Sequence, residues 1–197
     1  MDHDRAPGRL EVVGGPMFAG KSTELVRRVD RARIAGREVL VVGHALDVRS
    51  GPARIATHTG IAVESVPVDT PTAVEAHVRP TTDLVAIDEA QFFGPGLVDV
   101  VTRLADGGTD VVVAGLTVTF DGRPFEPLPS LMALAESVTR LTAVCTVCGR
   151  DAAFHVRLAD ALTPVGGDPL RAAPGHVGGA ESYAARCRAH RKVWSTG

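Results

Sequence analysis

Hydrophobic positions along the chain fall into short runs that are separated by mixed or polar stretches. Four runs rich in valine, leucine and isoleucine predict buried strands, at residues 10–13, 38–42, 84–87 and 111–114. Apolar residues at helical spacing predict a helix over 23–35, with Gly36 as its C-terminal stop, and a second helix over 96–105. Strands that alternate with helices in this way are typical of a parallel α/β sheet, although the pattern leaves the strand order open.

A glycine-rich segment lies between the first predicted strand and the first predicted helix. It fits the phosphate-loop pattern GxxxxGK[ST], whose backbone N–H groups surround a polyphosphate where side chains do not block the approach. Lys21 is then expected near the β and γ phosphates, and the Ser22 hydroxyl on magnesium. A glycine-rich turn that binds nothing is disfavoured, because strand, loop, lysine, hydroxyl and helix occur in the required order. The candidate ATP-binding residues are Gly15, Pro16, Met17, Phe18, Ala19, Gly20, Lys21, Ser22 and Thr23.

Two carboxylates follow the third predicted strand directly, at Asp88 and Glu89. Open α/β sheets bind their ligands at the carboxyl ends of their strands, so Asp88 fits a magnesium ligand. Glu89 can act on a hydroxyl of a second substrate, which makes a kinase, or on water, which makes an ATPase. The third alternative is that both acids meet only solvent or a helix N-terminus.

Composition bounds the protein class. A chain of 197 residues predicts one domain, or one domain with a small appendage. With 45% hydrophobic residues and a formal charge of −2, it gives no electrostatic reason to expect nucleic-acid or membrane binding. Residues 1–5 lack the apolar core of a signal peptide, so a cytoplasmic location is expected. Residues 44–60 show no clear periodicity and predict a surface loop.

Cysteine and histidine form two short motifs near the C-terminus. Cys145 and Cys148 make a CxxC, and Cys187 and His190 make a CxxH, with 38 residues between the two motifs. Three sulfurs and one imidazole complete a tetrahedral zinc set with no open position for water, which indicates a structural site. The alternative is three free cysteines and an unrelated histidine. Neither reading tells which nitrogen of His190 meets the metal.

Together these motifs resemble the type II thymidine kinases, a zinc-containing P-loop family. The resemblance runs from Leu10 to about Lys192 and is carried by residues 15–25, 88–93, 134–138, 141–145, 177–180, Tyr183 and 187–188. It implies a P-loop NTPase-like parallel sheet flanked by helices, with a small zinc-bound lasso domain. The implied divisions are a tail at 1–8, a nucleotide-binding domain at 9–142, the lasso domain at 143–192 and a tail at 193–197.

The resemblance also implies an activity and roles for residues. Such kinases transfer the γ-phosphoryl group of ATP to the 5′-hydroxyl of thymidine, in the presence of Mg²⁺, and assemble as homotetramers. Glu89 is implied as the general base, Asp47 as a sugar contact and Arg49 as a phosphate-stabilising cation. The implied thymidine-binding set comprises Met17, Phe92, Leu116 and Tyr183 around the base, and Val177, Gly178 and Gly179 at its polar edge. Phe125 and Phe120 are expected as pocket walls or core aromatics, with core packing favoured for Phe120.

Three departures from the family pattern bear on the substrate. Thr117 stands where family members commonly have aspartate, Ser50 where tyrosine is usual, and His44 where lysine is frequent. They keep open a kinase for deoxyuridine or a modified pyrimidine nucleoside. An alternative of another class is a P-loop ATPase or regulatory switch whose zinc module binds a partner. His58 matches the family's Thr-His and is expected to be structural.

Overall fold

A parallel sheet forms the centre of the fold. The computed structural model describes residues 6–46, 54–56, 62–158 and 180–191, and within them six strands pair in the order β5-β2-β6-β7-β1-β8, every pair parallel. The strands are β1 (Leu10–Gly15), β2 (Val39–His44), β5 (Val66–Val68), β6 (Leu84–Ile87), β7 (Asp110–Leu116) and β8 (Ser137–Arg140). The sheet confirms the predicted α/β class.

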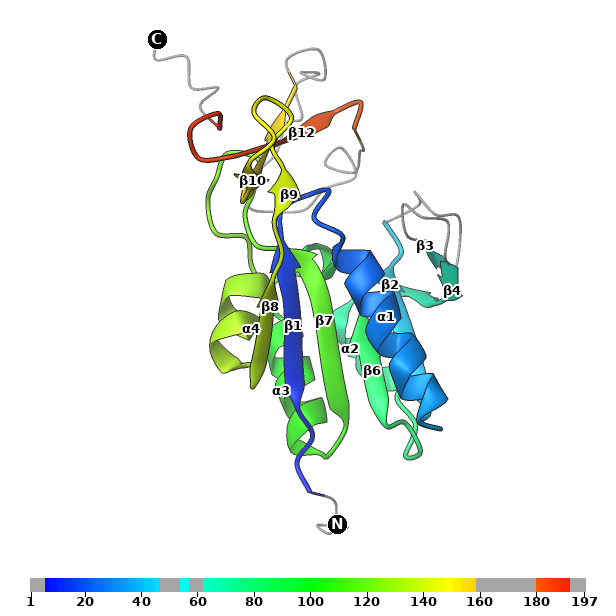
Figure 1. The fold of residues 1–197 in the computed structure, drawn as a ribbon. Coiled ribbons are helices and arrows are strands. Elements are labelled where there is room, and N and C mark those ends of the chain that lie inside the picture. The colour runs from blue at the N-terminus through cyan, green and yellow to red at the C-terminus, as the bar shows by residue number, and fades with distance from the viewer. Residues whose placement is uncertain (1–5, 47–53, 57–61, 159–179, 192–197) are drawn as a thin grey trace.

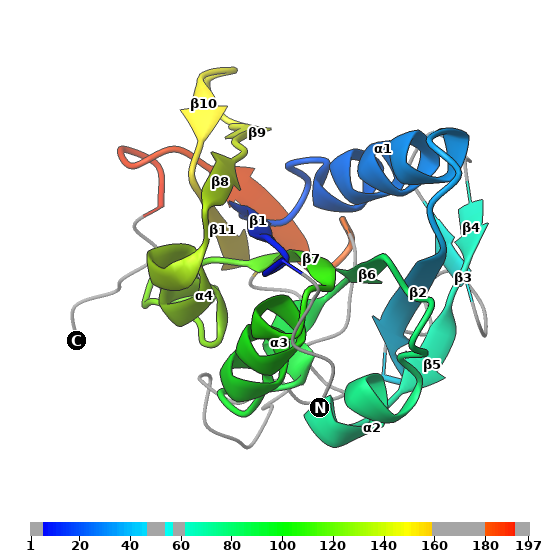
Figure 2. The ribbon, with the colours of Figure 1, turned by 90° about the horizontal axis from the view of Figure 1, so that it is seen from below.

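Helices cover both faces of this sheet. They are α1 (Lys21–Ile34), α2 (Pro71–Ala76), α3 (Leu97–Asp106) and α4 (Leu128–Leu134), with a 3-10 turn η1 (Ala90–Phe92). Figure 2 shows α1 on one face and α2, α3 and α4 on the other. No helix in the described part of the chain is long and apolar enough to cross a membrane.

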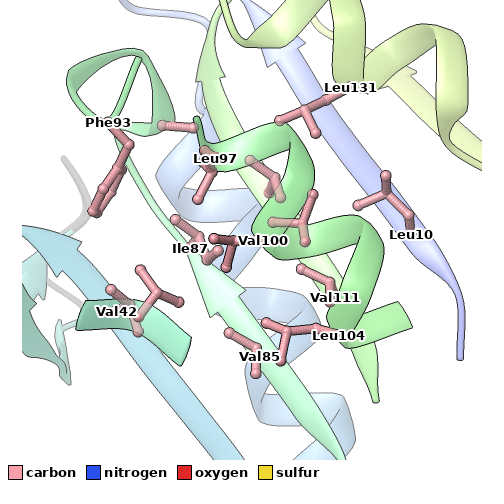
Figure 3. Packing of buried hydrophobic residues seen from close by; sticks show 14 of the residues in the cluster. Leu10, Val42, Val85, Ile87, Phe93, Leu97, Val100, Leu104, Val111 and Leu131 are labelled. Atoms are coloured by element: carbon pink, nitrogen blue, oxygen red, sulfur yellow. The ribbon is translucent and has the colours of Figure 1, made fainter. Parts of the chain in front are cut away.

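The two faces of the sheet build two separate cores. Successive side chains of a strand point to opposite faces, so Val12 packs with Leu97 and Val100 of α3, whereas Val13 packs with Leu25 and its neighbours in α1. Figure 3 shows the first core, in which residues of α3 lie over β6 and β7. Because both faces are covered, the central strands are continuous hydrophobic runs, which made them recognisable in the sequence.

Three short antiparallel hairpins complete the described structure. Their strands are β3 (Arg54–Ala56) with β4 (Ala62–Glu64), β9 (Ala143–Val144) with β10 (Asp151–Ala152), and β11 (Phe154–Arg157) with β12 (Tyr183–Arg186). In Figure 1, β9, β10 and β12 lie beyond the carboxyl ends of β1 and β7, at the same end as the loop between β1 and α1. The candidate functional segments therefore gather at one end of the molecule.

Some predicted boundaries and environments were wrong. The first helix begins at Lys21 rather than at residue 23, because the glycine-rich loop turns directly into it. Ile34, predicted on the apolar face of that helix, is 85% exposed. The predicted stop at Gly36 is confirmed by its φ of +76°. Residues 44–60 are not one irregular loop, since His44 ends β2 and 54–56 form a strand.

Candidate active site

The glycine-rich loop connects the end of β1 to the start of α1. A Cβ at Gly15 would lie 2.7 Å from the carbonyl oxygen of Leu141, so neighbouring backbone, as well as phosphate access, requires glycine there. Lys21 is the first residue of α1 and is buried, and its Nζ donates to the carbonyl oxygen of Pro16 at 2.8 Å. The lysine is thus folded back over its own loop, at the helix N-terminus where anions bind.

Asp88 lies directly beyond β6 and reaches the same loop. Its backbone N–H donates to the carbonyl of Val42 at 3.0 Å, and its carboxylate accepts a hydrogen bond from the Ser22 hydroxyl. Burial is the main factor that raises the pKa of Asp88, and the adjacent Glu89 carboxylate adds to it, while Ser22 and Lys21 act in the opposite direction. The structure therefore brings together the lysine, the hydroxyl and the first acid that the sequence singled out.

Glu89 follows in an unusual backbone conformation, with φ of +50° and ψ of +44°. Few residues other than glycine adopt the left-handed region, so its neighbours must hold this conformation. Its backbone N–H donates to Asp88 Oδ1 at 2.9 Å, and its carboxylate accepts a hydrogen bond from the amide of Gln91. Gln91 is buried and its Oε1 accepts from the backbone N–H of Leu116 at 3.0 Å.

The Gln91 amide thus joins Glu89 to the end of β7. A Cβ at Gly115, the preceding residue of β7, would stand 2.9 Å from Gln91 Oε1 and 2.6 Å from Leu128 Cδ2. Glycine at this position leaves the space that the amide occupies. Sequence reasoning gave Gln91 no role, although the residue lies in the segment 88–93 that carries the family resemblance.

The residues expected around the nucleoside come from different elements at this end of the fold. Met17 lies in the glycine-rich loop, Phe92 in η1, Leu116 at the end of β7 and Tyr183 at the start of β12. Met17 and Tyr183 are buried, as is Phe125, while Phe92 and Leu116 are half-buried. Phe120 is also half-buried, which does not decide between the two expected roles, a pocket wall and a core aromatic. Five other expected residues and one range lie outside the described residues: Asp47, Arg49, Ser50, His58, Lys192 and 177–179.

Two of the departures from the family pattern have defined surroundings. His44 is buried, and its ring contacts Phe92 and Phe93 with centroid separations of 5.5 and 4.7 Å. Thr117 is buried beside β1, and its Oγ1 has no hydrogen-bond partner in the part of the chain that the structure describes. Because Thr117 stands where aspartate is common in the family, residue 117 supplies a neutral hydroxyl instead of a carboxylate.

A second site lies where the two C-terminal hairpins meet. Cys145, Cys148, Cys187 and His190 hold their ligand atoms within 4.8 Å of one another. The separations are 3.7 Å for Cys148 Sγ to Cys187 Sγ, 3.7 Å for Cys145 Sγ to His190 Nδ1, and 3.3 Å for Cys187 Sγ to His190 Nδ1. A tetrahedral zinc ion with Zn–S bonds of about 2.3 Å requires sulfurs roughly 3.8 Å apart. The four residues therefore fit zinc, with Nδ1 as the nitrogen that faces the sulfurs.

The backbone around this cluster favours the thiolate that a metal needs. Burial acts to raise the pKa of Cys145, but backbone N–H groups of Cys187, Val147 and Cys148 lower it to about 5.

His155, in β11, is, like Gln91, a buried polar residue that the sequence did not mark as functional. A lone histidine in a short apolar strand carries no motif that distinguishes a site residue from a core residue.

Comparison with known protein families agrees with this geometry. A family model described as thymidine kinase matches residues 8–191. The match spans the glycine-rich loop, the acid pair, the hairpins and the cysteine cluster, and nearly all of the chain. The chain therefore belongs to the thymidine kinase family.

Proposed function

We propose that this protein transfers the γ-phosphoryl group of ATP to the 5′-hydroxyl of thymidine, which gives dTMP and ADP. The observation that carries the proposal is the position of Glu89, which is fixed by Gln91 and stands one residue beyond Asp88 beside the phosphate loop. A carboxylate that only met solvent would not need an unfavourable backbone conformation and a buried amide to hold it.

On the donor side, the backbone of residues 15–23 surrounds the triphosphate. Lys21 leaves the Pro16 carbonyl and places its ammonium group near the β and γ phosphates. The oxygens of Ser22 and Asp88 already lie within hydrogen-bond distance of each other, and such oxygens are the ligands that Mg²⁺ prefers. These two residues would hold the ion, which, when bound, neutralises charge on the β and γ phosphates.

On the acceptor side, Glu89 acts as general base. It takes the proton of the 5′-hydroxyl while the O5′–Pγ bond forms and the bond between Pγ and the β,γ-bridging oxygen breaks. Met17, Phe92, Leu116, Phe125 and Tyr183 form the walls of the nucleoside pocket. Asp47, Arg49 and residues 177–179 complete it as sugar, phosphate and base contacts, in keeping with the family pattern.

The zinc cluster has a structural role in this proposal. Four protein ligands leave no open coordination position, so the ion joins the β9–β10 and β11–β12 hairpins rather than taking part in the reaction. In the sequence, residues 159–179 stand between β11 and β12. The metal would thereby fix both ends of the segment that carries the proposed base contacts.

Replacement of Glu89 by glutamine tests the proposal. E89Q keeps the shape of the side chain but removes its basicity, so kcat should fall by roughly 10²–10⁴-fold. The matched control is E38Q, the same chemical change at an exposed residue just before β2. The assay contains ATP, magnesium and thymidine, and the monophosphate is identified directly; equal turnover of the two variants would remove Glu89 from the mechanism.

The same assay separates the alternatives. Deoxyuridine and a sample without acceptor run beside thymidine. A higher kcat/KM for deoxyuridine than for thymidine would favour a kinase for deoxyuridine, an alternative that Thr117 and Ser50 keep open. Hydrolysis of ATP without any phosphorylated nucleoside would instead identify an ATPase.

Family membership supports two further parts of the proposal, a homotetrameric assembly and a cytoplasmic location. Sedimentation velocity of the purified full-length chain tests the assembly. A monomer or dimer across the micromolar range would contradict it.

A further inference from the structure

One face of the β11–β12 hairpin carries polar side chains, of which His155 and Arg157 have no part in the proposed phosphoryl transfer. His155 pairs with Ala185 across the hairpin, and Arg157 pairs with Tyr183. Directly opposite residues of an antiparallel pair point to the same side, and residues two apart along a strand do so as well. His155, Arg157 and Tyr183 therefore share one face, and Val156 lies on the other.

Two side-chain nitrogens on this face are buried polar atoms. Among the described residues, nothing bonds to Nδ1 of His155 or to Nε of Arg157, although both atoms are buried. The His155 side chain is only 3% exposed, and its ring meets the Tyr183 ring edge-on with a centroid separation of 5.8 Å. Buried polar atoms in native proteins are nearly always paired, so each exception calls for an explanation such as an absent ligand.

Packing places this face of the hairpin beside the phosphate loop. Ala185, directly opposite His155, belongs to a buried cluster against which Phe18 and Ala19 of that loop pack. Burial is the main factor that lowers the pKa of His155; the Lys21 charge also lowers it and the Glu89 carboxylate opposes the change, which leaves the pKa at about 3. Both charges act on the ring because it lies close to the phosphate loop and to the proposed base. The imidazole is consequently neutral at physiological pH, with one donor and one acceptor nitrogen.

The neutrality of the His155 ring limits which part of the two substrates it can bind. It supplies no positive charge, so it is a poor partner for the triphosphate, which Lys21 already serves. It matches the neutral carbonyl, imino and hydroxyl groups of a nucleoside. Its neighbour Tyr183 is one of the proposed walls of the nucleoside pocket.

We propose that His155 is a specificity-determining residue of the acceptor site, and that its Nδ1 forms a hydrogen bond with a neutral polar group of the pyrimidine nucleoside. This inference rests on the proposed function for the identity of the ligand. Its chief competitor is a histidine that only fills the core. The two roles predict opposite effects on the stability of the free protein when the ring nitrogens are removed. An unpaired buried nitrogen weakens the fold of the free protein and forms its hydrogen bond only when the ligand binds, whereas a ring that only fills the core stabilises the free protein.

The experiment compares H155L with H155N and with the control V156A. Leucine removes the ring nitrogens at similar volume, whereas the Asn side chain can place a polar atom near the position of Nδ1. Val156 is buried on the opposite face of the same strand, so V156A disturbs the hairpin core without reaching the polar face. KM is measured for thymidine, deoxyuridine and ATP, and the melting temperature Tm is measured with and without thymidine.

The inference predicts that H155L raises the KM for thymidine by roughly tenfold and leaves the KM for ATP within twofold, while Tm of the free protein stays level or rises. H155N should recover part of the lost affinity, and V156A should lower Tm with thymidine KM unchanged. A thymidine KM equal to wild type in H155L would overturn the inference. So would a fall in Tm of the free H155L protein without a change in thymidine KM.

The outcomes for the wild-type protein keep the two proposals apart. If it binds thymidine without phosphorylating it, the proposed function fails, and the dissociation constants of the same variants still decide the role of His155. If wild type phosphorylates thymidine and H155L does so with the same KM, only the inference about His155 fails. A wild-type protein that neither binds nor phosphorylates a pyrimidine nucleoside overturns both.

Discussion

The substitution G115A tests whether the position of the proposed base depends on the packing beneath it. Gly115 lies in β7, where its added Cβ would meet Leu128 Cδ2 at 2.6 Å and Gln91 Oε1 at 2.9 Å. Ordinary contacts between such atoms lie near about 3.5 Å, so both neighbours must move by roughly half an ångström or more. Leu128, the first residue of α4, is fully buried and has little room to move.

Both expected effects can be given a magnitude. Added bulk in a packed core typically costs about 1–3 kcal/mol of the free energy of unfolding. Displacement of Gln91 also shifts the Glu89 carboxylate, which the Gln91 amide holds. Misplacement of a reacting group by about 1 Å can cost on the order of 10²-fold in rate, so we expect a fall in kcat of roughly 10–100-fold.

The matched control is G43A, in strand β2. A Cβ at Gly43 would lie 3.5 Å from Ser65 Oγ and 3.9 Å from Ile55 Cγ1, which are ordinary contacts. Urea unfolding gives the free energy of each variant, and steady-state kinetics with saturating ATP and thymidine gives kcat. If G115A kept the turnover of G43A, the Gly115–Gln91–Glu89 contact would not position the base, whatever the loss of stability.

Three further predictions concern Gln91, the cysteine cluster and the buried ring of His155. Q91E keeps an acceptor for the β7 backbone but replaces the donor to Glu89 with a like charge, so kcat should fall by at least about tenfold with the KM for ATP unchanged; wild-type kcat would contradict this. Elemental analysis of the wild-type protein should find one zinc ion per chain; C148S should lose this zinc, whereas V147A, between the two cysteines, should retain it. Zinc retained in C148S would contradict the ligand assignment. The pKa of His155, about 3, lies below the ordinary value near 6.5, so the unfolded chain takes up a proton that the folded chain does not, and stability is lost as pH falls. From pH 7 to pH 5 wild type should lose about 2 kcal/mol more than H155L in urea unfolding, and parallel losses would contradict the burial of a neutral ring.

The sequence predicted those elements whose signal is local. Strand β6 is apolar at every position because both faces of the sheet are covered, and it was found with its true bounds. The phosphate loop was recognisable because a strand, two glycines, a lysine and a helix must follow in that order. By contrast, β8 is an edge strand whose four residues alternate between half-buried and exposed, and α2 is only six residues long, so neither differs from a loop by pattern.

Other features depend on contacts between distant residues. The strand order depends on how the connections between parallel strands pack against the sheet, and no single segment of the sequence contains that information. The four cysteine and histidine ligands were predictable from their spacing, but the nitrogen of His190 that faces them was not. Gln91 received no role from the motif in which it lies, and His155 lies in no motif. Their significance comes from a β7 backbone N–H and from the neighbourhood of Lys21 and Glu89, which exist only in the folded chain.

The site divides into two parts that the fold supports differently. Asp88 and Glu89 stand at the end of a central strand, and Gln91 ties the base to β7, so this half is positioned by the most deeply buried part of the sheet. Tyr183 and His155 come from a two-stranded hairpin outside the six-stranded sheet, which the cysteine cluster joins to the β9–β10 hairpin. Rigid elements hold reacting groups more accurately than small appended ones do. Substitutions under β7 should therefore appear mainly in kcat, whereas substitutions on the face of the hairpin that carries His155 and Tyr183 should appear mainly in the KM for the nucleoside.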